Sequence, residues 1–406
     1  MFLAQGAQDG YSMLPDRSMV REDADTFFVS AAVAANIDLF TPGRHSAPAR
    51  YITAQRIFSG TRLEDVGRYP LATPFEVSLS IFRFGDDDAR PALGFVQRFL
   101  RGAIDADPAK MIYLAPHELG LRDAVLASGV PVDHVLSWDR SIPMRLGKGR
   151  PEGHYVKLFM PYRHGLIPVA TLGLMELDGK MAVDSALFLE RFVFVRAGLH
   201  HWYEGPDFAP LVEAVAEDPT LAALEQRERY LWANHLRSIV ALLWDGAKPS
   251  GKGPGHMIRK LVRQLAGTIP GKQLGAETVR RIGEAATTCM AHLGYDIAGA
   301  DLAESVVKLL NPASSQIAGE LRAFVDRLAQ GAIDRAELEV WKGERGLQHD
   351  WMQKLATERG MTLPEVEQPG GFWLRNACYS FDPEEVIADP VGFLRAAEEH
   401  RMKGVK

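Results

Sequence analysis

The segment PFEVSLSIFRF, residues 74–84, decides the class of fold in the first half of the chain. Apolar residues occupy every second position over most of its length, and this period of two predicts a β-strand with one buried face. Three further runs of the same texture are bounded by turn residues: YITAQRIF (51–58), YVKLFMPY (155–162) and PVATLGLMEL (168–177). A helical pattern over 92–104 is interspersed among them. This half of the chain therefore predicts an α+β domain with a mainly antiparallel sheet.

Amphipathic helices replace the strands in the second half of the chain. In the segment 231–244, Trp232, Leu236 and Ile239 fall on one helical face. A loop rich in Gly and Pro, AKPSGKGPG (247–255), ends this helix, and a second amphipathic helix follows it. We therefore expect two domains, an antiparallel sheet flanked by helices over residues 1–222 and an all-α domain over residues 223–406.

Composition excludes several classes of protein. The 406 residues are 47% hydrophobic and 24% charged, as in ordinary globular proteins, so the chain is neither disordered nor collagen-like. Cys289 and Cys378 are the only cysteines, which argues against a disulfide framework and against a bound zinc. No apolar run approaches the ~20 residues that cross a bilayer, and the first residues have no basic segment before an apolar one. We expect a cytoplasmic protein without a membrane partner.

Charge is concentrated in one block of the second half. The whole chain carries a net charge of −6, but the segment 229–272 holds eight basic residues and one acid, a net +7. Such a block either faces a polyanion such as RNA or is an ordinary solvated helical surface. The candidate RNA-binding residues are Arg237, Lys252, Arg259, Lys260 and Arg263.

Two segments of the first half carry residues suited to a nucleotide and a zwitterion. Arg56 lies late in one expected strand, and Phe75 and Glu76 begin the next, so that an arginine and an aromatic ring could clamp a phosphate and stack a base. In VDSALFLER (183–191), Asp184 ends a strand-like run and Glu190 and Arg191 lie on the following helix. An acid there can hold an ammonium group, and an arginine can neutralise phosphate. The structural alternatives are an arginine on an exposed strand face, an Asp N-cap and a surface ion pair.

These segments occur in an order that resembles the N-terminal part of alanyl-tRNA synthetase, a class II aminoacyl-tRNA synthetase. TAQRIFSGTRLEDVG and TPFEV are similar to motif 2 of that family, SQRCVRAGGKHNDLENVG followed by FFEM. AVDSALFLER is similar to its motif 3 region, VDTGMGLER. The most specific similarity is LWANHLRSIVALLWDGAKPSGKGPGHMIRKLVRQ (231–264), which parallels the IADHIR, DG, PS and GYVLRR elements in register. The family's editing domain and C-terminal module have no counterpart here.

The resemblance implies a class II synthetase-like catalytic domain over residues 1–222 and a helical tRNA-recognition-like domain over 223–406. Asp184 would bind the α-amino group of an amino acid, Arg191 and Arg56 would contact ATP phosphates, and Phe75 would stack near adenine. Further substrate- or ATP-binding candidates are Glu76, Thr171 and Glu190. The implied cofactors are ATP and Mg²⁺. The implied partners are a small amino acid, alanine first, and either a tRNA acceptor stem or another acceptor such as a carrier protein or a metabolite.

The chain departs from the family at several of its motifs. The motif 2 loop is four residues shorter, and the two glycines of motif 3 align with Ala186 and Phe188. A glycine lets backbone approach a ligand, whereas a phenylalanine could fill the space of a nucleotide. The family segment GDTGPCGPC has become GKGRPEGHY (147–155). The resemblance therefore implies a divergent paralogue of that family.

Two functions from different classes follow. The first is an alanine–tRNA ligase-like enzyme that forms an aminoacyl-adenylate and passes the aminoacyl group to an acceptor, with positioning and electrostatic stabilisation supplying most of the rate. The second is a synthetase-like protein that binds tRNA or aminoacyl-tRNA without activating an amino acid. A purely structural helical scaffold is a third possibility. An aromatic ring of Phe188 in the nucleotide volume would weigh against the enzyme.

Overall fold

The computed structural model describes residues 1–21, 27–61, 63–67, 72–137, 143–163, 165–364, 389, 391–392 and 394–396. The chain divides into two compact units. Unit 1 consists of Met1–Ser59, Tyr69–Gly205 and Gly371–Lys406, and unit 2 of Gly60–Arg68 and Pro206–Gly370. The main division thus falls before α6 (Ala209–Glu217), because this helix packs against helices of unit 2.

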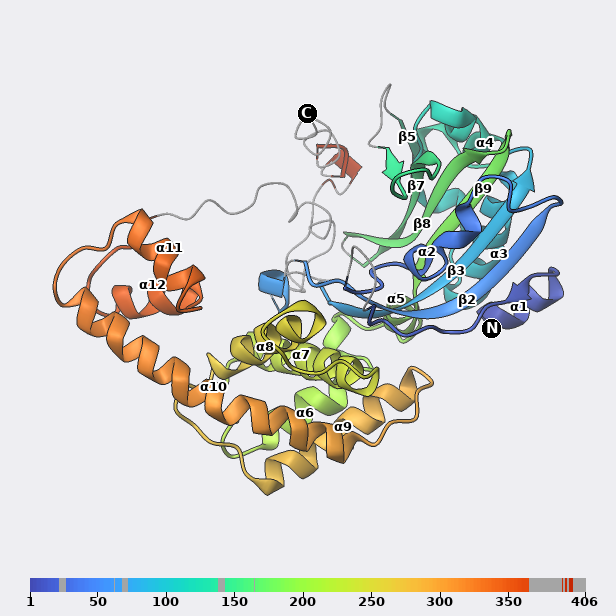
Figure 1. The fold of residues 1–406 in the computed structure, drawn as a ribbon. Coiled ribbons are helices and arrows are strands. Elements are labelled where there is room, and N and C mark those ends of the chain that lie inside the picture. Colours follow the sequence, from blue (N-terminus) through green and yellow to red (C-terminus); the bar gives the residue numbers. More distant parts are fainter. Residues whose placement is uncertain are drawn as a thin grey trace. The chain divides into compact units, whose positions relative to one another are not determined.

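A nine-stranded mixed sheet forms the centre of unit 1 (Figure 1). Its strands run in the order β1-β2-β3-β9-β8-β7-β4-β5, and β6 pairs with β7. The pairs β1–β2 and β4–β5 are parallel and the others antiparallel. The strands are β1 (Ser12–Met13), β2 (Ala49–Phe58), β3 (Phe75–Asp86), β4 (Ile112–Leu114), β5 (Val135–Leu136), β6 (Met144–Arg145), β7 (Glu152–Tyr162), β8 (Gly165–Leu177) and β9 (Lys180–Phe188).

The four long strands expected from the sequence all form. The alternating segment 74–84 becomes β3, and the three similar runs lie in β2, β7 and β8. Register places β3 between β2 and β9, with Phe82 opposite Asp184 and Ser80 opposite Thr53. Because side chains alternate along a strand, the register divides the central strands into two faces. We name the face that carries Asp184 the Asp184 face.

Helices cover both faces of the sheet. On the Asp184 face, Ala32 and Val33 of α2 and Phe40 of η1 pack with Phe82 and Phe84 of β3. On the other face, the ring of Tyr11 packs on α3 and its hydroxyl accepts a hydrogen bond from Arg83 of β3. The helices of unit 1 are α1 (Phe2–Gln8), α2 (Ala32–Ala35), α3 (Arg90–Ile104), α4 (Leu121–Ala127) and α5 (Leu189–Arg196), with 3-10 turns η1 (Ile37–Phe40), η3 (Pro108–Lys110), η4 (Glu118–Gly120), η5 (Val132–His134) and η6 (Trp202–Glu204).

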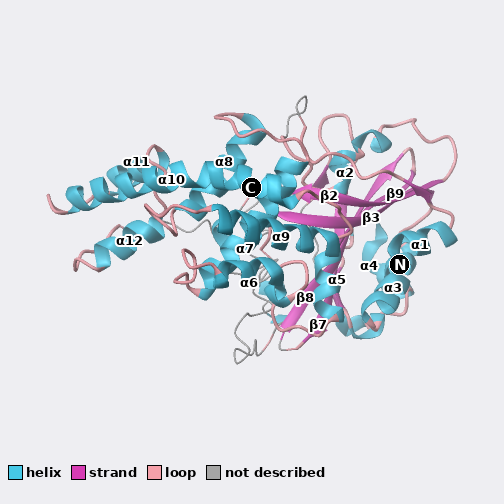
Figure 2. Ribbon diagram, turned by 90° about the horizontal axis from the view of Figure 1, so that it is seen from below, coloured by secondary structure: helices cyan, strands magenta, loops and turns pink. Residues whose placement is uncertain are grey.

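Unit 2 contains helices only, within the part of it that the structure describes (Figure 2). They are α6 (Ala209–Glu217), α7 (Gln226–Trp244), α8 (Gly253–Ala266), α9 (Ala276–His292), α10 (Gly299–Leu328), α11 (Arg335–Gly343) and α12 (His349–Thr357), with a 3-10 turn η2 (Leu63–Asp65). Helix α7 starts five residues before the apolar pattern that predicted it, because Glu225 and Glu228 form a capping box. Its residues Trp232, Leu236 and Ile239 are fully buried, as their spacing predicts.

The predicted fold class is confirmed. A mainly antiparallel sheet flanked by helices forms in the first half, and helices alone follow it in the described residues of the second half. No helix in the described residues is long and apolar enough to cross a bilayer.

Candidate functional site

Asp184 is a buried carboxyl group in the middle of the sheet. It lies on β9 between Phe82 of β3 and Gly173 of β8. The expectation that Asp184 ends a strand is wrong, because β9 pairs on both sides and continues to Phe188. The residue is 7% exposed, and its Oδ1 has no hydrogen-bond partner among the described residues. Burial raises the pKa of this carboxyl well above its ordinary range.

The neighbours of Asp184 on the adjacent strands are apolar. A Cβ atom on Gly173 would collide with the sulfur of Met144, so the Met144 side chain lies directly on this glycine. Met144 and Phe82 belong to one buried cluster with Met175 and Ala182. No cationic side chain among the described residues pairs with this carboxyl group, and buried polar groups without partners are rare in folded proteins. Asp184 is thus suited to receive a ligand that brings a positive charge.

The partners of Arg191 among the described residues lie in unit 1. It lies in the first turn of α5, where Nη1 donates a 2.8 Å hydrogen bond to the Pro168 carbonyl oxygen and Nη2 lies 3.6 Å from Oε1 of Glu76. Its Cζ lies 4.0 Å from the centroid of the Phe188 ring. Burial lowers the pKa of Arg191, while Glu76 and Glu190 oppose this shift. The structure therefore brings together two candidate residues, Glu76 and Arg191, that the sequence places on separate segments.

Glu190 accepts hydrogen bonds from the backbone of β3. Its carboxylate is almost completely buried, and both oxygens accept hydrogen bonds from the backbone N–H of Val77, at 3.2 and 3.1 Å. These bonds tie the start of α5 to β3 and orient the helix that carries Arg191.

Arg56 lies on the opposite face of the sheet from Asp184. It is paired with Val77 in the register, whereas Glu76 and Ser78 share the face of Asp184. Its Nε donates a 2.6 Å hydrogen bond to Oδ2 of Asp16, and its backbone N–H donates to Oδ1 of the same carboxylate. The structure therefore does not bring Arg56 together with Asp184.

Phe75 and Thr171 differ in accessibility. Phe75 is completely buried, so its ring presents no face to solvent and its exposure gives no support to adenine stacking. Thr171 is partly exposed on β8 and lies opposite Ala186, which places it on the Asp184 face. Thr171 is thus the predicted residue that shares a face and a neighbouring position with Asp184.

Arg237 does not belong to the RNA-binding surface expected from the sequence. Its side chain is completely buried, its Nη1 lies 3.1 Å from Oδ2 of Asp207, and its Cζ lies 3.8 Å from the centroid of the Phe208 ring. A guanidinium without solvent contact cannot meet a phosphate backbone. We correct the expectation for this residue: Arg237 is a core ion-pair partner.

The other basic residues lie in and around α8. Lys252, Arg259 and Lys260 are exposed, and α8 contains no acidic residue. Lys248, in the loop before the helix, is exposed as well. We name Lys248, Lys252, Arg259 and Lys260 the basic surface.

Arg263 differs from the basic surface. It is half-buried and donates hydrogen bonds to the Gln316 side chain, at 3.2 Å, and to the Arg345 carbonyl oxygen, at 2.8 Å. It thus links α8 to α10 and to the end of α11.

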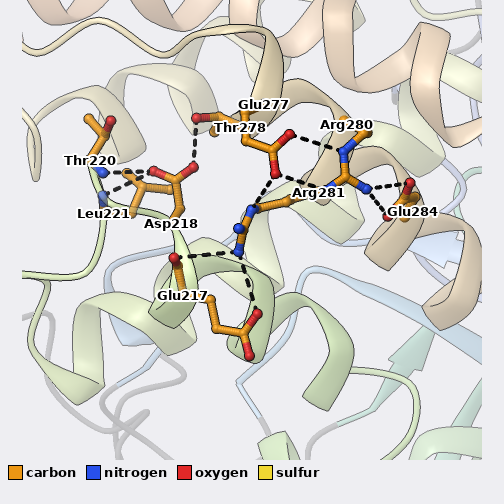
Figure 3. Close-up of polar contacts among 9 residues, drawn as sticks. All are labelled: Glu217, Asp218, Thr220, Leu221, Glu277, Thr278, Arg280, Arg281 and Glu284. Atoms are coloured by element: carbon orange, nitrogen blue, oxygen red, sulfur yellow. Dashed lines mark hydrogen bonds and ion pairs between the residues drawn. The ribbon is translucent and has the colours of Figure 1, made fainter.

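Sequence inspection did not identify an ion-pair network of unit 2 that lies on α6 and α9 (Figure 3). Arg280 pairs with Glu277 and Glu284, and Arg281 pairs with Glu277 and Glu217. The hydrogen bond from Arg280 is the main cause that lowers the pKa of Glu277 to about 2. A shallow depression of about 380 Å³ is bordered by Glu217, Arg280, Arg281 and Glu284 of this network. Because each arginine is matched by two carboxylates, the network adds no net positive surface.

Sequence inspection also missed two partners of predicted residues, Asp16 and Asp207. Each is far along the chain from the arginine that it contacts, and no local pattern signals such a pair. Among the described residues, no three His, Cys, Asp or Glu side chains gather as metal ligands. The expected absence of bound zinc stays a prediction.

Comparisons with known proteins agree with the resemblance seen in the sequence. No family model matches the chain. The chain is similar to curated alanine–tRNA ligases. It is 23% identical to that of Tropheryma whipplei, over 65% of this chain and 33% of the relative. It is 26% identical to that of Herpetosiphon aurantiacus, over 65% of this chain and 34% of the relative. It is 24% identical to that of Chloroflexus aurantiacus, over 90% of this chain and 46% of the relative.

The chain thus spans between a third and a half of the length of these relatives. Among solved structures it is similar to apo histidyl-tRNA synthetase of S. aureus, with a TM-score of 0.34 and 10% sequence identity, over 48% of this chain and 64% of that chain. The resemblance to alanyl-tRNA synthetase is confirmed by the curated relatives, each of the three named above being an alanine–tRNA ligase.

Proposed function

We propose that the chain is an alanyl-tRNA synthetase-like protein that holds a small amino acid, alanine first, at Asp184 and a tRNA acceptor end on the basic surface. The observation that carries the proposal is the buried carboxyl group of Asp184, whose Oδ1 has no partner among the described residues. An α-ammonium group supplies both the positive charge and the N–H donors that this carboxylate lacks.

The walls around Asp184 favour a small ligand. Phe82 flanks Asp184 on one neighbouring strand, and Met144 lies on Gly173 of the other. Apolar neighbours suit a ligand with a methyl side chain better than one with a charged side chain, because removing that charge from water is costly. These contacts support alanine as the first candidate.

The basic surface supports a polyanionic partner. Lys248, Lys252, Arg259 and Lys260 are exposed on one helix and on the loop before it, and no acid on α8 offsets them. Phosphate contacts by such side chains release counterions, so RNA affinity should fall steeply with salt. The curated relatives are alanine–tRNA ligases, which supports tRNA as the RNA. Nothing among the described residues favours a carrier protein or a metabolite as acceptor.

ATP-dependent activation is one form of this function. An oxygen of the amino acid's carboxylate would attack the α-phosphorus of ATP, forming aminoacyl-AMP and displacing pyrophosphate, with Mg²⁺ neutralising the phosphates. Asp184 and Arg191, at the positions that match motif 3, support this form. The aminoacyl group would then pass to the tRNA.

Binding without activation is the second form, and the geometry favours it. Arg56 pairs with Asp16 and lies on the opposite face from Asp184. Arg191 contacts Glu76, the Pro168 carbonyl and the Phe188 ring. Arg56 therefore shares no triphosphate site with Asp184, and the guanidinium of Arg191 already has partners within the protein. In this form the protein would deliver or regulate tRNA or aminoacyl-tRNA, and its expected cytoplasmic location stays a prediction.

ATP–pyrophosphate exchange with alanine, glycine and serine distinguishes the two forms. Filter binding measures tRNA binding, which both forms require. Tight tRNA binding without exchange supports the second form. Exchange with alanine that Asp184→Ala abolishes, while tRNA affinity is kept, supports the first. A chain that binds neither alanine nor tRNA overturns the proposal.

A further inference from the structure

The contacts of Arg191 include each kind of partner that a guanidinium offers to a nucleotide. Its Nη1 donates to the Pro168 carbonyl oxygen, its Nη2 lies 3.6 Å from the Glu76 carboxylate, and its Cζ lies 4.0 Å from the centroid of the Phe188 ring. Guanidinium groups bind phosphates through N–H donors and stack on planar rings through their faces. In this chain a carboxylate takes the phosphate's role and a phenyl ring takes the role of a nucleobase.

The Phe188 ring is held in place from within the fold. Phe188 is the last residue of β9, and its side chain packs against the buried cluster of Val29, Ala35 and Ile57. Along β9, the alternation of side chains puts Asp184 and Phe188 on the same face, with Ala186 between them. The ring therefore belongs to the face of the sheet that carries Asp184, and it lies against Arg191.

The similarity to alanine–tRNA ligases implies ATP, and the residues of this chain do not fit it. Arg191 is enclosed by internal partners, Arg56 is paired with Asp16 on the opposite face, and Phe75 has no exposed ring surface. We infer that the Phe188 ring is an internal substitute for a nucleotide on Arg191, so that the wild-type chain does not bind ATP at this arginine. This inference rests on the proposed synthetase-like function, of which it specifies the form without activation.

Glu76 and Phe188 contact Arg191 in different ways. Glu76 lies 3.6 Å from the guanidinium, a charge contact that a competing phosphate could replace. Phe188 occupies space, and only removal of its ring frees the face of Arg191. The difference predicts that nucleotide binding responds to the size of residue 188 more than to the charge of residue 76.

The test measures binding of Mg·ATP to the full chain by isothermal titration calorimetry. The variants are Phe188→Gly, which removes the ring, and Phe188→Leu, which keeps apolar bulk at the same place. We expect no saturable binding by the wild type or by Phe188→Leu, and an affinity at least about tenfold higher for Phe188→Gly. Adding Arg191→Gln to Phe188→Gly should remove the gain, which shows that the freed guanidinium is the ligand. Circular dichroism confirms that each variant is folded.

Two results overturn the inference. The first is saturable ATP binding by the wild type that Arg191→Gln abolishes, a measurement that does not depend on the folding of Phe188→Gly. The second is a folded Phe188→Gly variant that binds ATP no better than the wild type. Alanine titrated into the same samples tests the proposed amino-acid site separately. A wild-type chain that does not bind alanine would refute that site without bearing on Phe188.

Discussion

Arg237 and Asp207 form an ion pair of 3.1 Å whose side chains are 0% and 4% exposed. The guanidinium also lies over the ring of Phe208. One of the eight positive charges counted in the basic block is therefore neutralised inside unit 2. The surface available to RNA is smaller than the sequence suggests and is concentrated around α8.

Breaking this pair should destabilise unit 2 without weakening RNA binding. Arg237→Ala leaves the Asp207 carboxylate buried without a cation, which typically costs about 3–5 kcal/mol of the free energy of unfolding. Urea unfolding measures the loss, and the double variant Arg237→Met/Asp207→Leu should recover most of it. An Arg237→Ala protein that keeps its stability but loses RNA affinity would contradict the assignment.

Neutralising the basic surface should weaken RNA binding with a definite salt signature. Each of Lys252→Ala, Arg259→Ala and Lys260→Ala should lower the affinity and reduce the slope of log K against log salt by about 0.9 for each phosphate that is no longer neutralised. Arg280→Ala is the matched control, because Glu277 and Glu284 already balance its charge (Figure 3). Equal losses from Arg280→Ala and the three test variants would show that the effect is not local.

The free energy of unfolding should fall as the pH rises, because of Asp184. Because burial raises its native pKa above that of the unfolded chain, the native state keeps its proton longer. The stabilising effect is complete below the ordinary Asp pKa and is lost as the pH rises to the native value, by about 1.4 kcal/mol per pH unit in that window.

Urea unfolding of wild type and Asp184→Asn from pH 4 to pH 8 measures this effect. The free energy of unfolding of Asp184→Asn should rise relative to that of the wild type as the pH increases. Saturating alanine should reduce this difference. A difference between the two proteins that does not change with pH would refute a raised pKa at Asp184.

Cys289 should be unreactive in the folded protein. It is completely buried in α9, and burial raises the pKa of its thiol to about 12. Only the thiolate reacts, so a disulfide reagent should modify Cys289 about 100-fold more slowly in the folded state than in urea. The measurement uses a Cys378→Ser variant, because Cys378 lies outside the described residues. Rapid modification at pH 8 without denaturant would contradict the burial.

The sequence predicts the strands and helices well because their signals are local. The period of two in the segment 74–84 and the apolar spacing in 231–244 depend only on neighbouring residues, and both elements form. Cys289, which lies among apolar residues of a helical segment, is likewise buried in the structure.

The candidate site could be predicted only in part. The sequence pattern proposes Asp184, Glu190 and Arg191 as candidates, but the faces of the sheet depend on pairing between distant strands. That pairing separates Arg56 from Asp184 and places the Phe188 ring on Arg191. Burial is likewise a long-range property, so a basic residue on an amphipathic helix, such as Arg237, could not be assigned to the core from its own segment.

The most direct measurement of the central claim is calorimetric titration of alanine into the wild-type chain and into Asp184→Asn, with propionate as the ligand that lacks the amine. The account predicts saturable alanine binding by the wild type, at least about tenfold weaker binding by Asp184→Asn, and no propionate binding by either. Equal alanine affinity in the two proteins, or binding of propionate as strong as that of alanine, would contradict it.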